Sequence, residues 1–376
     1  MNDKPYHYRP KEPVHPGTHL RFCIEELGIS GRELALRCKK PEKTISAILN
    51  GKSAITFDMA LALEPVLRSP ANFWINGQKQ YEEAIARQKR ELNLQPSAEN
   101  TAWAKQFDYN GLAKAGAVPV TRKRQERLEA LLLLIGISSP AAWDGFVKYR
   151  SKVLLSQARK TGRASEANLE AWLAFGMQRA QTLWCGTFDA VAFQLAIDGL
   201  RDVMAEADEQ CWERIESDCL KAGVKVVFTP LIKGVPIQGA VHWVAETPVI
   251  QLSSEGKGYG KTWQAFLYEA AHVLLHPKKS FLDPIVRPKK KGEAGRDDYR
   301  IRAADQWADH WLVAEPEMQQ WGKPSTCADV QRMADDLKTH PDVLLTRMER
   351  NGDEIRPQWE SLRQNLPKPK PTDKGY

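Results

Sequence analysis

The sequence lacks paired cysteines and long apolar runs. Its six cysteines are scattered over 376 residues without a Cys-x-x-Cys pair, which argues against a thiolate zinc site and fits reduced thiols. No run approaches the ~20 apolar residues that a membrane span needs. The first residues, MNDKPYHYRPKEP, have no apolar core of the kind that a signal peptide requires. These absences predict a cytoplasmic protein that does not contact a membrane.

Several catalytic signatures are also absent. The chain has no glycine-rich phosphate loop, no Ser-His-Asp signature and no cysteine in a reactive context, so no cofactor is expected. Hydrophobic residues make up 42% and charged residues 27%, which is the balance of an ordinary globular protein. At about 150 residues per domain, the length predicts two or three domains. The net charge of +7 is compatible with a polyanionic partner, although charge alone is a weak signal.

Capping signals predict a helix pair near the N-terminus. Ser30 and Glu33 have the spacing of a capping box, in which the hydroxyl accepts a backbone N–H and the carboxylate reaches back to the serine N–H. The next helix is predicted to start at Pro41, a residue favoured at the first helical position. It ends before Gly51, which supplies a left-handed cap. Further helices are predicted over 18–27, 56–67 and 70–90.

The predicted pair has the order of a helix-turn-helix, whose second helix enters the DNA major groove. Ala35 is small where the two helices cross, and Ile45 is one of the apolar residues that pack them together. Near the start of the second helix, Lys43 would donate to guanine and Glu42 would accept from cytosine. The Ala47 methyl would meet a thymine methyl. The predicted DNA-contacting residues are Glu42, Lys43, Thr44, Ser46 and Ala47, with Asn50 and Lys52 on phosphates.

This stretch resembles a known family of DNA-binding domains. LALRCKKPEKTISAILNGKSAIT, followed by ALALEPVLRSPANFWINGQKQYE, resembles the Cro/CI-like (XRE) helix-turn-helix domain, and more closely its HigA-type antitoxin branch. The resemblance implies a lambda-repressor-like fold of five helices and a homodimer on operator DNA. It also implies repression of the protein's own operon beside a toxin gene. KKP at the turn departs from the small polar residues usual there, which weakens the base assignments. A helical bundle with incidental caps and a helix-turn-helix used for protein contact are the alternatives.

The C-terminal half contains part of a zinc-peptidase motif. Three strands are predicted over 225–229, 240–245 and 249–252, followed by an apolar helix, WQAFLYEAAHVLLH. An HExxH motif needs two histidines four apart on one helical face and a glutamate that activates the metal-bound water. Glu269 and His272 occupy the glutamate and second histidine positions, and Tyr268 occupies the first. A catalytic site with three protein ligands cannot be built from His272 alone.

The surroundings of this motif resemble the ImmA/IrrE metallopeptidase family. PVIQLSSEGKGYGKTWQAF, HVLLHPKK and AADQWADHWLV carry the resemblance. It implies a zincin-like small sheet with helices, and an acidic third zinc ligand upstream of Ala304 and Asp305. Residues 301–303 (Ile, Arg and Ala) cannot supply that ligand, and Ala271 replaces the family's glycine. The resemblance therefore implies a peptidase-like domain with a degenerate motif, kept for sensing or for binding a partner.

Two other functions remain open. His272 and His276 share a helical face, so they could bind zinc together with Asp283, Asp298, Asp305 or His310 in an active peptidase that cleaves a repressor. A toxin-neutralising protein that does not bind an operator is the other alternative. The basic run 287–291 is interpreted as a solvated loop, with DNA or an acidic partner as alternatives.

The predicted fold class is mainly α with an α+β C-terminal part. Helical apolar spacing, as in the run from Leu128 to Ile135, predicts a helical middle. Further helices are predicted over about 191–204, 210–222, 263–276 and 300–315. The predicted domains are 1–16, a flexible arm; 17–94, the helix-turn-helix; 101–222, a helical linker domain; 223–330, the degenerate peptidase-like domain; and 331–376, a C-terminal helix and a disordered tail.

Overall fold

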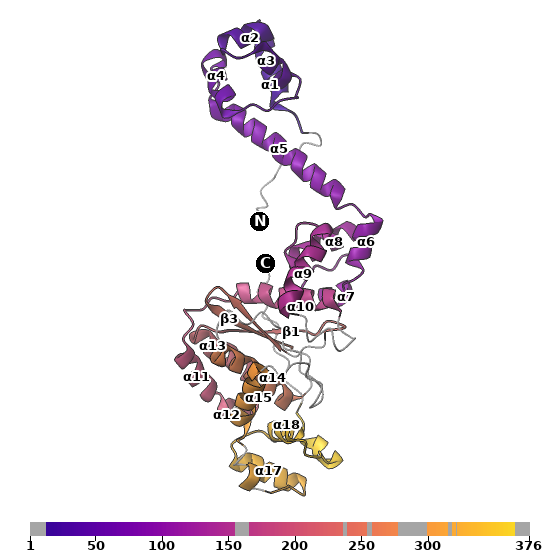
Figure 1. Ribbon diagram of the computed structural model, residues 1–376, viewed down its shortest axis with the longest axis vertical. Helices are drawn as coiled ribbons and strands as arrows, with labels where there is room; N and C mark the ends of the chain where they lie inside the picture. The colour runs from indigo at the N-terminus through magenta and orange to yellow at the C-terminus, as the bar shows by residue number, and fades with distance from the viewer. Residues whose placement is uncertain are drawn as a thin grey trace. The chain divides into compact units, whose positions relative to one another are not determined.

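The computed structural model (Figure 1) describes residues 13–154, 165–235, 239–253, 258–276, 299–314, 318–320 and 322–364. The chain divides into two compact units, Met1–Gln95 and Pro96–Tyr376. This boundary falls at the predicted linker. The finer division of the second unit at residue 223 stays a prediction, and most of the predicted arm and of the predicted tail lies outside the described residues.

The described part of the first unit, residues 13–95, contains five helices, as the sequence predicts. Its core contains Leu20, Leu34, Ile45, Leu63 and Trp74, one from each helix. Each helix buries one apolar face, the usual arrangement of surface helices around a small core. The helices are α1 (Pro16–Glu26), α2 (Gly31–Arg37), α3 (Glu42–Leu49), α4 (Phe57–Leu67) and α5 (Ala71–Asn93).

The cap of α2 is only half of the predicted box. Ser30 Oγ accepts from the Glu33 backbone N–H at 3.1 Å. The Glu33 carboxylate accepts instead from Arg37, one turn further along the helix, because an (i, i+4) pair offers it a cationic donor. Pro41 is the N-cap of α3 and not its first helical residue. The predicted reciprocal bond and the predicted helix start are therefore both wrong.

The second unit begins with helices, which are more interrupted than the sequence predicts. The single helix predicted over 191–204 is two helices, because the chain leaves the helix at Gly199 and Leu200. The helices of this region are α6 (Ala98–Ala104), α7 (Tyr109–Lys114), α8 (Arg124–Ile135), the 3-10 helix η1 (Pro140–Ala142), α9 (Trp143–Leu154), α10 (Glu166–Gln181), α11 (Ala190–Asp198), α12 (Arg201–Glu206) and α13 (Cys211–Lys221).

One segment of this region contradicts the prediction that the chain lacks an apolar run of membrane-spanning length. Within the described residues, Arg124–Tyr149 is long and apolar enough to cross a membrane by length and composition. In the structure, Gly136 (φ +79°) ends α8, and η1 and α9 follow. Leu131 and Leu132 of α8 are buried, whereas 28% of the most apolar 18-residue window in this segment is buried.

A three-stranded mixed sheet lies in the middle of the second unit, close to the predicted positions (Figure 1). Its strands are β1 (Lys225–Thr229), β2 (Gly239–Val244) and β3 (Thr247–Ser253), in the order β1-β3-β2. β3 is parallel to β1 and antiparallel to β2. Alternate side chains face opposite layers: Val227 packs with α10, whereas Val226 joins the core around α13 and α14.

The C-terminal part is more ordered than the sequence predicts. In place of one helix and a tail, residues 327–362 form two helices and a 3-10 helix around a small core that includes Met333, Leu344 and Trp359. The predicted helices over 263–276 and 300–315 are present with shifted ends. The elements are α14 (Tyr259–Leu275), α15 (Tyr299–Leu312), α17 (Cys327–Asp336), α18 (Pro341–Asn351) and η4 (Pro357–Leu362).

Candidate nucleic-acid interface

Helices α2 and α3 pack closely through the residues that the sequence predicts. Ala35 of α2 and Ile45 of α3 are both buried. A Cβ on Gly31, the first residue of α2, would lie 3.3 Å from Leu49 Cδ1. Because the two helices approach this closely, α3 is held firmly against α2, and its opposite face is left toward solvent.

The outer face of α3 carries the predicted base-reading residues. Glu42, Lys43 and Ser46 are exposed, and Thr44 and Ala47 are half-buried beside them. Glu42 Oε2 lies 4.0 Å from Arg32 Nε in an exposed pair, which solvent weakens. Within the part of the chain that the structure describes, no hydrogen bond or ion pair engages Lys43.

The turn that precedes α3 gives a structural role to one lysine of the unusual KKP sequence. Lys39 adopts a left-handed conformation with φ +53°, the region that favours glycine. Lys40 makes an ion pair with Asp58 at the start of α4, so this lysine is already occupied. Of the two lysines, only Lys39 projects as an exposed side chain.

The loop after α3 is fixed to the rest of the first unit. Gly51 has φ +68° and provides the predicted left-handed cap. The Ile55 N–H donates to Gln78 Oε1 of α5 at 3.0 Å, and Gln78 is buried. A buried backbone–side chain bond of this kind holds the loop in one conformation. Lys52 is exposed within this loop.

The C-terminal end of α3 has a feature that the sequence does not reveal. Asn50 Nδ2 donates to the Ser46 carbonyl at 2.9 Å. Arg21 Nη2, from α1, donates to the Leu49 carbonyl at 2.7 Å and to Asn50 Oδ1 at 3.1 Å. The Asn50 amide, predicted to contact a phosphate, is therefore engaged within the unit. Arg21 carries no local signal, because it meets these residues from a distant part of the chain.

The residues of the predicted peptidase-like motif lie on α14 of the second unit. Tyr268, Glu269 and His272 are 1–2% exposed. The Tyr268 and His272 rings meet edge to face with centroids 4.8 Å apart, and the His272 and His276 centroids are 4.9 Å apart. A Cβ on Gly239 of β2 would lie 2.8 Å from Glu269 Oε1, so the sheet backbone closely approaches the carboxylate.

The predicted zinc partners of these histidines do not complete a metal site among the described residues. Asp305 makes an ion pair with Arg350 at 2.7 Å, and His310 is exposed on α15. No group of three or more His, Cys, Asp and Glu side chains suited to a metal ion is found in the described ranges. Asp283, Asp298 and the basic run 287–291 lie outside those ranges. Among the described residues, the predicted ligands are therefore not brought together around His272 and His276.

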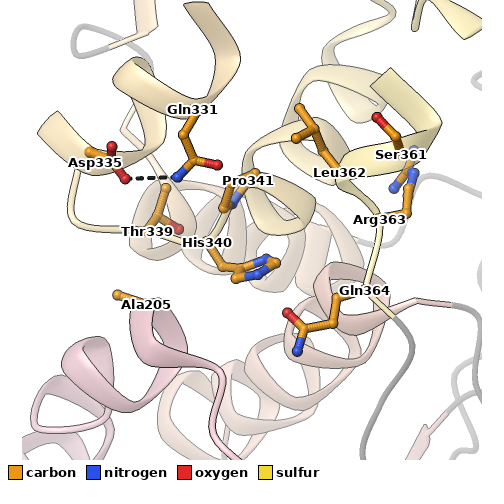
Figure 2. A pocket seen from close by; sticks show the side chains of 10 residues that line it. All are labelled: Ala205, Gln331, Asp335, Thr339, His340, Pro341, Ser361, Leu362, Arg363 and Gln364. Carbon is orange, nitrogen blue, oxygen red and sulfur yellow. Dashed lines mark hydrogen bonds between the residues drawn. The ribbon is translucent and has the colours of Figure 1, made fainter. Parts of the chain in front are cut away.

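A polar pocket of about 450 Å³ lies elsewhere in the second unit. Figure 2 shows the side chains that line it. Gln331 donates to Asp335 at 2.9 Å on one side of it. His340 Nδ1 accepts from the Asp342 N–H at 3.1 Å. Burial lowers the pKa of the His340 imidazole despite the nearby Asp342 carboxylate. The sequence offers no sign of this pocket, because Ala205 and residues 331–364 come together only when the chain folds. Its lining residues are Ala205, Gln331, Asp335, Thr339, His340, Pro341, Ser361, Leu362, Arg363 and Gln364.

Comparisons with known proteins concern a small part of this chain. A family model described as helix-turn-helix matches residues 20–74. Virulence-associated protein A of Dichelobacter nodosus is 36% identical over 73 residues, which are 19% of this chain and 72% of that protein. The uncharacterized HTH-type transcriptional regulator YddM of Escherichia coli (strain K12) is 35% identical over 71 residues, or 19% of this chain and 76% of that protein.

A solved structure gives a similar match. The Pseudomonas aeruginosa antitoxin HigA, solved with the higBA promoter, is 30% identical. The match covers 23% of this chain and 98% of that chain, with a TM-score of 0.21. Through its first unit, the chain belongs to the XRE-type helix-turn-helix family of DNA-binding proteins.

Proposed function

We propose that this chain is a sequence-specific transcriptional regulator that acts in the cytoplasm and binds operator DNA as a homodimer without a cofactor. The observation that carries the proposal is the outer face of α3. There the exposed Lys43 and Ser46 stand on a helix that its neighbours hold rigidly. Side chains near the start of such a helix reach base edges in the major groove. The E. coli relative is also described as a transcriptional regulator.

The biological setting that fits best is autorepression of an operon that also encodes a toxin. This part of the proposal rests on the HigA-like sequence LNGKSAIT and its sequel SPANFWINGQKQY. Toxin neutralisation without operator binding is the competing function. Affinity for the DNA upstream of the coding sequence, measured beside affinity for the product of any adjacent small gene, separates the two.

For the second unit, we propose a peptidase-like domain of the ImmA/IrrE kind that does not hydrolyse peptides. Tyr268 at the first ligand position supports this, as does Asp305, which is engaged by Arg350. Its role would then be to sense an effector or to hold a partner. We propose the pocket between α17, α18 and η4 as the binding site of a small polar effector.

The tests are DNA binding and metal content of the full chain. We expect a labelled upstream fragment to be retarded in gels, with an affinity far above that for unrelated DNA and falling steeply as salt rises. Equal binding to all DNA, or none at low salt, would refute the regulator. Stoichiometric zinc in the purified protein that disappears in His272→Ala would instead favour an active metallopeptidase.

A further inference from the structure

Arg21 connects helix α1 to the end of helix α3. Its Nη2 donates to the Leu49 carbonyl at 2.7 Å and to Asn50 Oδ1 at 3.1 Å. The last turn of a helix leaves carbonyl oxygens without partners and carries partial negative charge. The guanidinium satisfies one of these oxygens and opposes that charge. Asn50 continues the connection, because its Nδ2 donates back to the Ser46 carbonyl at 2.9 Å.

The two helices are also in direct backbone contact at this point. A Cβ placed on Gly17 of α1 would lie 1.9 Å from the Ile48 carbonyl oxygen, closer than any real contact, so only glycine lets α1 approach the last turn of α3. Arg21 lies one turn further along α1. A displacement of Arg21 would therefore also displace α3, because a hydrogen bond and a close packing contact join α1 to the end of α3.

The guanidinium has donors to spare. Arginine presents five N–H donors in a planar fork, and the two bonds to Leu49 and Asn50 both use Nη2. In the portion of the chain that the structure covers, no acceptor is found for Nε or Nη1, and the side chain is exposed. Such a fork matches the geometry of a phosphate group.

The position of Arg21 fits the edge of a DNA groove. α3 has eight residues, which corresponds to about 12 Å along its axis, close to the ~12 Å width of the major groove. If the first turn of α3 reaches base edges, its last turn lies near the rim, where the phosphates are. Lys52, the other exposed cation at this end, lies in the loop that follows.

We propose that Arg21 binds a DNA phosphate with its free donors while it holds the end of α3, and so sets the depth of that helix in the groove. This inference rests on the proposed DNA-binding function. It moves the phosphate contact predicted for Asn50 to a residue of α1, outside the α2–α3 pair. Arg21 is thus both a phosphate ligand and a positioning residue for the bases read by α3.

The test compares three variants of the full chain. Arg21→Gln removes the charge, Arg21→Lys keeps it without the fork, and Arg90→Gln is the control. Arg90 is exposed on α5. It lies about 18 Å along that helix from Gln78, the residue that contacts the loop after α3. This distance exceeds the ~10 Å screening length at 0.1 M salt. Binding to the upstream fragment and to an unrelated duplex is followed by fluorescence anisotropy between about 50 and 200 mM salt.

We expect Arg21→Gln to lose one phosphate contact on both duplexes. The negative slope of log affinity against log salt then becomes shallower by about 0.9. The factor by which affinity decreases between the two salt concentrations is therefore about 3.5-fold smaller than for the unaltered chain. Arg21→Lys keeps the slope but binds more weakly, because one ammonium cannot serve both α3 and the phosphate. Arg90→Gln leaves slope and affinity unchanged.

The outcomes separate the inference from the function on which it rests. An unchanged slope in Arg21→Gln, with normal binding by the unaltered chain, would leave Arg21 a purely structural role and overturn the inference alone. If Arg21→Gln does not fold, the test rests on Arg21→Lys. An affinity of Arg21→Lys for DNA equal to that of the unaltered chain would contradict the dual role of Arg21. Failure of the unaltered chain to bind either duplex overturns the proposed function and, with it, this inference.

Discussion

Lys39, in the turn between α2 and α3, carries a backbone strain that one substitution removes. Its φ is +53°, and in the left-handed region an L side chain costs roughly 1–2 kcal/mol. Glycine avoids that cost but loses roughly 0.5–1 kcal/mol of additional conformational entropy on folding. The difference predicts that Lys39→Gly raises the free energy of unfolding of the first unit by about 0.5–1 kcal/mol. For a domain of this size, the Tm rises by about 2–8 °C.

The loss of the side chain itself contributes little to this change. Lys39 is exposed, and no bond to another described residue holds its ammonium, so truncation falls within about ±0.5 kcal/mol. Lys39→Ala keeps the Cβ and is the matched control for which no gain is expected. Lys338, between α17 and α18, has φ +50°. Lys338→Gly is therefore expected to stabilise the second unit and leave the first unchanged.

Hydrogen exchange of the full chain measures the two units separately. Peptides from α2 and α3 report the first unit, and peptides from α18 report the second. The expected gain slows exchange of the most protected amides of the first unit about two- to fivefold in Lys39→Gly. Equal protection in Lys39→Gly and Lys39→Ala, or weaker protection in Lys39→Gly, would refute the assignment of strain to this backbone angle.

Three further predictions concern base recognition by α3, the packing of α1 against α3, and the pH dependence of stability. Lys43→Ala is expected to relax base preference at one position by about 1–3 kcal/mol, whereas Lys52→Ala weakens binding to all DNA and lowers the salt slope by about 1, both followed by anisotropy. Gly17→Ala forces α1 away from α3 and costs the first unit about 1–3 kcal/mol, as urea unfolding would show; an unchanged midpoint contradicts the close approach. Burial raises the pKa of Glu216 to about 7 from 4.5, although Arg179 opposes the shift. In the unfolded chain the Glu216 carboxyl loses its proton near pH 4.5, whereas in the folded chain it does so only near pH 7. The free energy of unfolding therefore falls as pH rises through that window. Glu216→Gln should therefore raise the Tm at pH 8 but not at pH 4, and equal changes at both would count against this pKa.

The features that the sequence predicts are those decided within one turn or one strand. Ser30 caps α2 through a residue three positions away, and Gly51 has the left-handed angle that its place after α3 requires. The strand KVVFT has the bounds that the sequence predicts, because β-branched residues next to a glycine leave few alternatives. The Tyr268 and His272 rings meet because residues four apart lie on the same face of a helix.

The features that the sequence does not predict depend on distant partners. Glu33 has two good local partners, and the choice of Arg37 over the Ser30 N–H is set by small energy differences. Arg21 and Asn50 meet only after α1 packs on α3. Residues 327–362 have a polar, proline-containing composition. Their order depends on a small core of their own, in which Trp359 packs with Leu344 and Met333.

The mixed sheet of the second unit has a consequence for protein synthesis. β2 and β3 form a hairpin closed by two residues, since Val244 pairs with Thr247, and such hairpins form in about 1–10 μs. β1 precedes them and pairs with β3, so it has no partner strand until β3 has been synthesised. At about 5–20 residues per second, the ribosome needs on the order of seconds to extend the chain from Thr229 to Ser253. During that interval the apolar segment KVVFT has no strand beside it. The nascent chain, and not the folded protein, is therefore the form in which this segment is most open to aggregation or to capture by a chaperone.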